Sequence, residues 1–298
     1  MPIDTASLMQ QVTRIRMLTG RLVDERLCGE YHSVFKGQGI EFDEVRPYLP
    51  GDDIRHIDWN VTARCGTPHI KRYSEERELT VIFMVDVSGS QVFGSGQRAK
   101  AERAAEVACL LALSALRNQD KVGLLLFSDR IISYLPPRKG RTAVRRLVRD
   151  VLAAEATRQG TDLAGALGFL RAVQRRRAVV FLLTDFMDRD YETALRICAR
   201  RHDIIACPLA DVRESELPPL GLITFEDPET GECRLIDAGS RALREHLAHR
   251  ALELRRELES LFRRLALDAV FIDTEQPFLG SIHRLFRQRL SHPRRGRR

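Results

Sequence analysis

Residues 81–90 read VIFMVDVSGS: an apolar run, then Asp86, then two serines at alternate positions. A near-continuous apolar run is typical of a strand that is buried on both faces of a parallel sheet. Polar residues directly after such a strand lie beyond its carboxyl end, where open α/β sheets bind their ligands. This stretch therefore predicts an α/β fold and also the edge of the sheet at which a site should lie.

Three more apolar runs follow, at residues 121–127, 178–183 and 204–209. Helical patterns precede or separate them, over Gln97–Leu116, Arg141–Leu152, Asp162–Val173 and Tyr191–Arg200. Apolar strands that alternate with helices require a parallel sheet covered on both faces. We therefore predict a doubly wound, mainly parallel α/β sheet.

The rest of this domain is predicted from turn residues and leucine spacing. The turn-rich segment Asp227–Glu232 separates two short β-like pieces, which predicts an inserted hairpin at about residues 221–237. A leucine stripe from Leu243 to Leu265 indicates a long helix, followed by a strand at Ala269–Ile272 and a helix at Ser281–Leu290. The α/β domain is expected to span residues 79–290.

The chain before residue 79 has a different character. Helical spacing of apolar residues runs from Ala6 to about Leu27. Glycines and prolines then punctuate short β-like pieces such as Ile40–Val45 and His69–Tyr73. Residues 1–78 are therefore expected to form a helix plus an irregular, β-containing module.

Composition and charge exclude several classes of protein. Of the 298 residues, 44% are hydrophobic, which is enough for a sizeable core, but the longest apolar run is too short to cross a membrane. The six cysteines show no C-x-x-C pair, and the N-terminus lacks a signal-peptide pattern. These features favour a cytoplasmic protein.

The net charge of +7 is concentrated at the C-terminus. Residues 291–298 contain four arginines, and the remainder of the chain is close to balanced. A general nucleic-acid surface is therefore poorly supported. The basic tail is either a disordered, solubilising end or a contact for RNA or anionic lipid.

Oxygen-bearing side chains gather in the predicted strand-to-helix loops. Gly89 would let the first loop curl so that two hydroxyls face one point, a threonine opens a later helix, and an aspartate follows the third strand. Two carboxylates and three hydroxyls are ligands suited to Mg²⁺ or Mn²⁺. The candidate metal ligands are Asp86, Ser88, Ser90, Thr161 and Asp185.

This arrangement resembles the metal-ion-dependent adhesion site of von Willebrand factor A-type domains, and all five positions match. The resemblance implies that the serines and the threonine contact the metal directly. The aspartates would hold it directly or through water. It also implies one open coordination position that accepts a carboxylate from a protein partner.

A second resemblance covers roughly residues 15–290. The chain is similar to the bacterial family called domain of unknown function 58, on the segments Gly37–Phe42, Arg46-Pro47-Tyr48, Pro50-Gly51-Asp52, Arg55, Ile57-Asp58-Trp59 and Ala63-Arg64. Other members often carry a preceding membrane hairpin, so this chain resembles a short, soluble version. The family resemblance also implies a partnership with a MoxR-type AAA+ ATPase.

A polar cluster surrounds the single tryptophan. Its members allow two interpretations: a structural network of buried Asp–Arg pairs, or a patch that contacts a partner or performs catalysis. These residues are Asp52, Asp53, Arg55, His56, Asp58 and Trp59.

Three functions remain open after the motif search. Gly94–Ala99 mimics a dinucleotide fingerprint but lies too far past its strand, and no P-loop, H-E-x-x-H or G-x-S-x-G motif occurs. No catalytic constellation stands out, so we expect a non-enzymatic, metal-dependent adaptor. A Mg²⁺- or Mn²⁺-dependent phosphoesterase using Asp86, and an RNA-associated protein using the basic tail, are the alternatives.

Overall fold

The computed structural model describes residues 25–34, 41–74, 79–93, 99–154, 157, 159–226 and 231–291. The chain forms two compact units. Helix α2 (Glu25–Val34) and the chain from Thr80 belong to one unit, and residues 35–79 form the other. The structure therefore assigns α2 to the α/β unit, whereas the sequence suggested a boundary at residue 78 with everything before it in one module. The earlier part of the predicted N-terminal helix and the basic tail lie outside the described residues.

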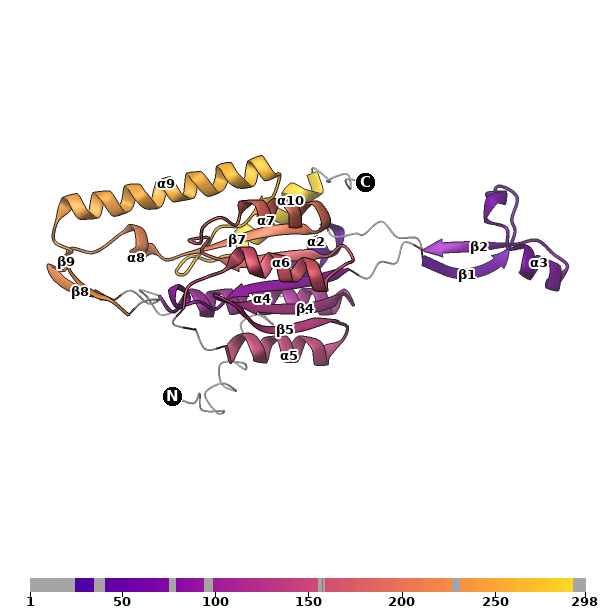
Figure 1. Ribbon diagram of the computed structural model, residues 1–298. Helices are drawn as coiled ribbons and strands as arrows, with labels where there is room; N and C mark the ends of the chain where they lie inside the picture. Colours follow the sequence, from indigo (N-terminus) through magenta and orange to yellow (C-terminus); the bar gives the residue numbers. More distant parts are fainter. Residues whose placement is uncertain are drawn as a thin grey trace. The chain divides into compact units, whose positions relative to one another are not determined.

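The α/β unit is built on a seven-stranded sheet. Four strands run parallel to one another: β3 (Thr80–Asp86), β4 (Lys121–Phe127), β6 (Val179–Thr184) and β7 (Asp203–Ala210). Strand β5 (Ile131–Arg138) pairs antiparallel with β4 at one edge. Two short pieces, β10 (Asp268–Ala269) and β11 (Ile272–Asp273), pair with β7, where the sequence predicted one continuous strand. The doubly wound, mainly parallel α/β sheet is confirmed (Figure 1).

The order of the strands fixes where a ligand can bind. Along the sheet the order is β10-β7-β6-β3-β4-β5. The chain leaves β3 toward β4 on one side and later returns to place β6 on the other side of β3. Such a reversal opens a crevice at the carboxyl ends of the two strands. The switch point therefore lies between the ends of β3 and β6, at Asp86 and Asp185.

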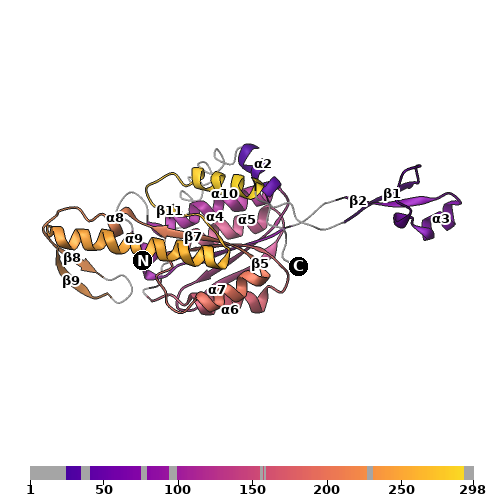
Figure 2. The ribbon, with the colours of Figure 1, turned by 90° about the horizontal axis from the view of Figure 1, so that it is seen from above.

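Helices cover both faces of the sheet (Figure 2). One face carries α2, α4 (Lys100–Arg117), α5 (Arg141–Leu152) and α10 (Leu279–Ser291). The other carries α6 (Leu163–Val173) and α7 (Glu192–Arg201). Because side chains alternate across a strand, Ile82 and Met84 of β3 are buried in the α6–α7 core. The ring of Phe83 stacks on Phe181, with centroids 5.6 Å apart.

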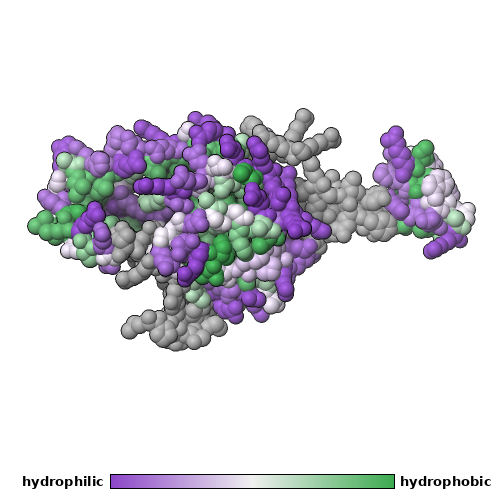
Figure 3. All heavy atoms as spheres, in the orientation of Figure 1, coloured by the Kyte–Doolittle hydropathy of each residue, from purple (hydrophilic) through white to green (hydrophobic). Residues whose placement is uncertain are grey.

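An arm follows β7 beyond its carboxyl end. It comprises the short helix α8 (Val212–Ser215), the hairpin of β8 (Leu222–Glu226) and β9 (Cys233–Asp237), and the N-terminal part of α9 (Arg241–Leu265). The predicted hairpin is therefore present. Leu258, Leu261 and Phe262 near the end of α9 are buried in the α6–α7 core. The space-filling view shows apolar side chains at the hairpin, where Leu222 and Leu235 are exposed (Figure 3).

The second unit is a β-containing module, as the sequence predicted. Strands β1 (Glu41–Pro47) and β2 (His69–Ser74) pair antiparallel. Between them lie the 3₁₀ helix η1 (Ile54–His56) and the α-helix α3 (Trp59–Cys65). Helix α3 was not predicted, although Asp58 is a typical N-cap residue and Gly66 ends the helix in the left-handed conformation.

Two further properties concern the helices and the cysteines of the described residues. None of the described helices has the length and apolar character needed to cross a membrane. The cysteines whose side chains are described, at positions 65, 109, 198, 207 and 233, are all thiols.

Candidate functional site

Asp86 ends β3 and is fully buried. Its Oδ1 accepts a hydrogen bond from the backbone N–H of Ser88 at 2.9 Å. Its Oδ2 accepts one from the hydroxyl of Thr184 at 2.6 Å, and Thr184 is the last residue of β6. The carboxylate therefore joins the ends of the two strands that flank the switch point.

The two serines of the motif lie together. The Oγ atoms of Ser88 and Ser90 are 3.1 Å apart. Ser88 precedes the 3₁₀ helix η2 (Gly89–Val92) and makes no side-chain capping bond, so its hydroxyl is directed to Ser90. Gln91 is also buried, and its amide nitrogen donates to Ser90 Oγ at 3.4 Å. Among the described residues, no group donates to the buried Gln91 Oε1.

Thr161 belongs to a loop that packs against the Asp86–Ser90 segment. The backbone N–H of Thr157 donates to Val87 O at 2.9 Å, and that of Gly89 donates to Gln159 O at 3.4 Å. Thr161 follows two residues later and is half-buried. The next residue, Asp162, caps α6 by accepting from Gly165 N at 2.7 Å. The loop brings Thr161 to the same end of the sheet as Asp86.

Asp185 follows β6 and is buried, and it faces a lysine. Its Oδ1 accepts from Met187 N at 3.2 Å, and its Oδ2 lies 3.2 Å from Nζ of Lys100. Lys100 is the first residue of α4 and is fully buried. Its ammonium forms a second ion pair with Glu214 of α8. Asp185 therefore has a built-in cationic partner.

The electrostatics of the two aspartates follow from this burial. Burial and the nearby charge of Asp185 raise the pKa of Asp86 to about 6, although its hydrogen bonds from Thr184 and Ser88 oppose the rise. Burial alone would lower the pKa of Lys100, but Asp185 and Glu214 raise it above its ordinary value. Lys100 is therefore a buried ammonium ion that pairs with Asp185 and Glu214.

The side chains at this site fit a hard divalent cation. Within the described ranges, no three His, Cys, Asp or Glu side chains gather as a metal site by themselves. A cation would therefore depend on hydroxyl oxygens as well as on the two carboxylates. Ser88 and Ser90 supply such oxygens beside Asp86, and no described residue donates to the side-chain oxygen Oε1 of Gln91. Oxygen ligands of this kind are those that Mg²⁺ and Mn²⁺ prefer.

Sequence reasoning missed four residues of this site. Thr184 directly precedes Asp185, so its place at a strand end was a usable signal. Gln91 adjoins the serine motif in the same way. Lys100 and Glu214 gave no local signal, because their pairing joins α4 to α8 across more than 100 residues of sequence.

The aspartates of the polar cluster in the second unit form their contacts within that unit, mostly with residues nearby in the sequence. Asp52 forms a bidentate pair with Arg46 at 2.7 and 2.9 Å, and hydrogen bonds from Arg46 and from Leu49 N lower its pKa. Asp53 and Asp58 accept from backbone N–H groups and cap η1 and α3. The first of the two interpretations, a network of buried Asp–Arg pairs, is wrong in detail, because these acids are exposed or half-buried and Arg55 donates only its backbone N–H, to Asp53 Oδ1.

The remaining members of that cluster are exposed. Arg55 and His56 lie on the surface of the module, and the ring of Trp59 is 70% exposed. The structure gives no geometry for catalysis at these residues. A contact with a partner stays a prediction.

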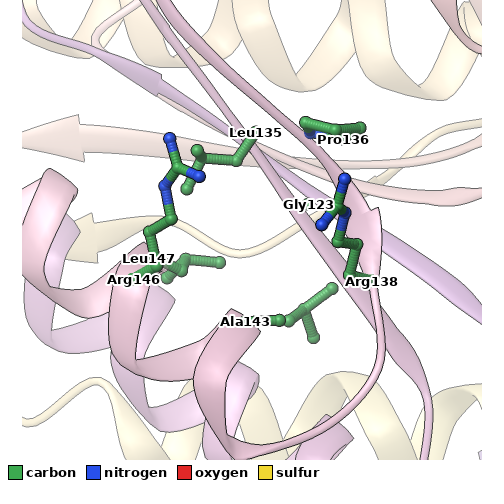
Figure 4. A pocket seen from close by; sticks show the side chains of 8 residues that line it. Gly123, Leu135, Pro136, Arg138, Ala143, Arg146 and Leu147 are labelled. Atoms are coloured by element: carbon green, nitrogen blue, oxygen red, sulfur yellow. The ribbon is translucent and has the colours of Figure 1, made fainter.

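A small cavity lies elsewhere in the α/β unit. It has a volume of about 180 Å³ and is bounded by β4, β5 and α5. Figure 4 shows Arg146 of α5 and Arg138 of β5 flanking it, with Leu135 and Leu147 among the apolar residues of its wall. None of the candidate metal ligands lines this cavity.

Comparison with known proteins places the chain in a family. Residues 44–257, more than half of the chain, match the family described as protein of unknown function DUF58. Uncharacterized proteins of Mycobacterium tuberculosis (Rv1480) and Mycobacterium bovis (Mb1516) are each 29% identical over 290 residues. These alignments cover 96% of this chain and 91% of each relative.

Solved structures similar to this chain share little sequence with it. The conserved hypothetical protein BatB of Bacteroides thetaiotaomicron has a TM-score of 0.45 and 16% identity, over 72% of this chain and 98% of that one. The VWA domain of SpRpn10 has a TM-score of 0.36 and 12% identity, over 69% and 94% of the two chains. Neither similarity bears on function. On the family match, the chain belongs to the DUF58 family.

Proposed function

We propose that the chain is a metal-dependent protein-binding adaptor whose site lies at the carboxyl ends of β3 and β6. The observation that carries this proposal is the placement of two buried carboxylates, Asp86 and Asp185, at the switch point beside two serine hydroxyls. A doubly wound sheet binds its ligands at this position. Mg²⁺ or Mn²⁺ would be the cofactor.

The roles of the residues follow from their chemistry. Ser88, Ser90 and Thr161 would offer neutral hydroxyl oxygens, and Asp86 and Asp185 would offer charge. Hard cations favour octahedral oxygen coordination and keep positions open for external ligands. A carboxylate on a protein partner would complete the coordination and supply the negative charge that a site with only two acids lacks.

The partner proposed for this site is a MoxR-type AAA+ ATPase. It rests on what the family resemblance in the sequence implies, together with a site whose chemistry suits the capture of a carboxylate on another protein. The free thiols and the lack of a membrane-spanning helix among the described residues are compatible with a cytoplasmic location. The adaptor would tether the ATPase or deliver a client protein to it.

A phosphoesterase is the second function considered, and the contacts of Asp86 disfavour it. Both oxygens of this carboxylate already accept hydrogen bonds, from Ser88 N and Thr184 Oγ1. An aspartate nucleophile is normally activated by a neighbouring acid or base. Ser88 stands where an aspartyl-phosphate enzyme would carry its second acid. An RNA-associated role would use the basic tail, of which residues 292–298 lie outside the described part of the chain.

The proposal is tested by capture from native lysate in Mg²⁺ and in EDTA, with the tagged wild-type chain and Asp86→Ala compared by mass spectrometry. Asp150→Asn on α5 serves as a matched control that also removes one carboxylate. We expect an AAA+ ATPase to be retained only in Mg²⁺, by wild type and Asp150→Asn but not by Asp86→Ala. Equal retention by Asp86→Ala would contradict the mechanism. Metal-dependent turnover of phosphoesters that is lost in Asp86→Ala would favour the enzyme instead.

A further inference from the structure

We propose that Lys100 is an internal cation that holds the metal affinity of the site low until a partner carboxylate arrives. This inference rests on the proposed function, because it concerns the same two aspartates. Lys100 is not one of the oxygen ligands, and its charge has the same sign as the metal. Its position makes it the side chain that decides how strongly the site attracts a divalent cation before a partner binds.

The burial of Lys100 shows that its charge is held in place by specific partners. Its side chain is completely inaccessible to solvent, whereas lysine is almost never fully buried unless it is paired. Its Nζ lies 3.2 Å from Asp185 Oδ2 and also contacts Glu214. Both acids therefore compete for one ammonium group.

The sharing of Lys100 between the two acids determines how strongly Asp185 attracts a second cation. A cation close to a carboxylate stabilises its charged form and repels a second cation that approaches the same group. A Mg²⁺ ion at Asp185 therefore meets an oxygen whose charge Lys100 already partly offsets. Glu214 weakens this effect, because it draws part of the ammonium's interaction toward α8.

Glu214 is held in position by its own helix. Its Oε2 accepts from Asp211 N at 3.0 Å, and Asp211 in turn accepts from Arg213 N at 2.8 Å, which completes a capping box on α8. The opposing acid is thus fixed independently of the candidate metal ligands. Two substitutions at the same ion pair should then change metal affinity in opposite directions.

The test is Mn²⁺ binding by the purified full-length chain near neutral pH, measured from the electron paramagnetic resonance signal of free Mn²⁺. Lys100→Met keeps the length of the side chain but removes its charge, and we expect it to tighten binding by about tenfold. Glu214→Gln leaves Lys100 to Asp185 alone, and we expect several-fold weaker binding. Lys139→Met, which removes the same charge from an exposed turn, should leave affinity unchanged.

The outcomes separate the two proposals. Binding by wild type that Lys100→Met leaves unchanged or weakens, or that Glu214→Gln tightens, overturns the role of Lys100 and leaves the metal site standing. Absence of Mn²⁺ binding in wild type and in both variants overturns the metal dependence itself. If Lys100→Met fails to fold, Glu214→Gln alone decides, since its expected effect is opposite in sign.

A second, independent observation concerns six exposed arginines near the amino ends of β6 and β7, at the end of the sheet opposite to the candidate metal site. They lie at the ends of α6 and α7 and in the turn that enters β6, and we call them the arginine surface: Arg171, Arg175, Arg176, Arg177, Arg200 and Arg201. We infer that this surface binds an acidic segment of a partner protein. The segment would be separate from the carboxylate that meets the metal.

These arginines are unpaired, in contrast to those of α9. Within the described residues, none of the six forms an ion pair with a carboxylate, and residues 163–177 and 193–202 contain no Asp or Glu. On α9, by comparison, Arg241 pairs with Glu245 and Arg255 pairs with Glu259. Glutamates of α9 therefore offset part of the charge of its arginines, whereas no acid lies within the segments of α6 and α7 that carry the arginine surface.

The residue types in a groove of this surface favour a peptide over a single-stranded nucleic acid as its ligand. A groove between α6 and α7 is lined by Gly168, Arg171, Ala172, Ile197, Arg200 and Arg201. Its apolar lining residues are Ala172 and Ile197, and none of the described residues that line it is aromatic, whereas proteins that hold single-stranded nucleic acid stack bases on aromatic rings. Carboxylates pair well with arginine forks, and an apolar residue between them would cover Ile197.

The charges of the arginine surface also affect a buried histidine beneath it. His202 follows α7 and is buried, and burial together with the charges of Arg201 and Arg177 lowers its pKa to about 4. The guanidinium of Arg201 also donates to Arg171 O at 3.3 Å, which holds it at the end of α6. An acidic ligand would relieve the repulsion among these like charges.

The test is fluorescence anisotropy with a labelled peptide of glutamates interspersed with leucines, its glutamine counterpart and a single-stranded RNA. We compare the triple variant Arg171→Glu, Arg200→Glu, Arg201→Glu with a charge-matched triple on α9, Arg241→Glu, Arg250→Glu, Arg255→Glu. Affinity for the acidic peptide should fall at least about tenfold in the first triple and change little in the second. Equal losses in both, or tighter binding of the RNA than of the peptide, would overturn the inference.

Discussion

The two ends of the central sheet differ in whether their charged side chains are buried and paired. At the carboxyl ends of β3 and β6, Asp86, Asp185 and Lys100 are buried, and each has a polar or ionic partner. At the amino ends of β6 and β7, the arginine surface is exposed, and no described carboxylate pairs with it. The six residues of β6 span about 20 Å between these two ends.

This difference suggests that the buried charges at the carboxyl end mainly affect folding stability, whereas the exposed arginines mainly affect the binding of other molecules. Burying a charge is costly unless a partner offsets the lost hydration, so the carboxyl end must keep its pairs for the protein to fold. Exposed charges cost little in folding and remain available to an external ligand. Changes at the carboxyl end should therefore alter stability strongly, and changes at the arginine surface should alter mainly the binding of other molecules.

The largest expected effect is that of Lys100→Ala. It leaves Asp185 buried without its cation and opens a cavity, which should lower the free energy of unfolding by about 3–5 kcal/mol. Urea denaturation measures this loss. Arg200→Ala, on the arginine surface, is the control and should change stability by no more than about 0.5 kcal/mol. Similar losses in the two variants would erase the contrast between the two ends.

A second prediction concerns Asp86 without divalent cations. Its pKa of about 6 in the folded protein is raised above its ordinary value of 3.8, so its charged form destabilises the fold above pH 6 and has no such effect below the ordinary value. Asp86→Asn should therefore raise the free energy of unfolding by about 2–3 kcal/mol at pH 7.5, with the gain disappearing near pH 4. Denaturation across this pH range, in EDTA, measures it. A loss of stability at pH 7.5 would show that the carboxylate is fully compensated.

The third prediction uses His202, beneath the arginine surface. Its pKa of about 4 lies below the ordinary 6.5, so the stability that depends on neutral His202 is complete above pH 6.5 and is lost as pH falls toward 4. His202→Leu should remove about 1–3 kcal/mol of this acid-dependent loss. The slope of unfolding free energy against pH, compared between variant and wild type, is the measurement. An unchanged slope would mean that His202 titrates normally.

The smallest expected effect is that of Arg201→Glu on His202. Replacing a repelling charge by an attracting one should raise the pKa of His202 by roughly one unit, with little change in stability. Titration of the His202 ring by nuclear magnetic resonance reports it directly. Arg241→Glu on α9 should leave that pKa unchanged. Equal shifts in both variants would point to net charge and not to the arginine surface.

The sequence predicts the parts of the fold that depend on local patterns. The apolar runs of β3, β4, β6 and β7 gave the parallel sheet because a strand buried on both faces has almost no polar residues. Strand β5 was missed because it lies at the edge, is half-exposed and contains Pro136 and Pro137, which normally argue against a strand. Helix α3 was missed because it is short and has no buried face.

At the candidate site, too, the sequence predicts only what a local pattern records. Asp86, Ser88 and Ser90 lie within five residues, and Asp185 follows a recognisable strand, so motif and position predicted their meeting. The ion pairs of Lys100 with Asp185 and Glu214 join segments 85 or more residues apart. Only tertiary packing brings them together, and no local spacing records it.

The central claim is that Asp86 and Asp185 hold a divalent cation at the switch point of the sheet. Anomalous diffraction from crystals grown in Mn²⁺ tests it most directly, with crystals of Asp86→Asn as the control. We expect one manganese peak bordered by both carboxylates and by the hydroxyls of Ser88 and Ser90, and no peak in the variant. Saturating Mn²⁺ with no peak at this position, or with a peak that persists in Asp86→Asn, would contradict the claim.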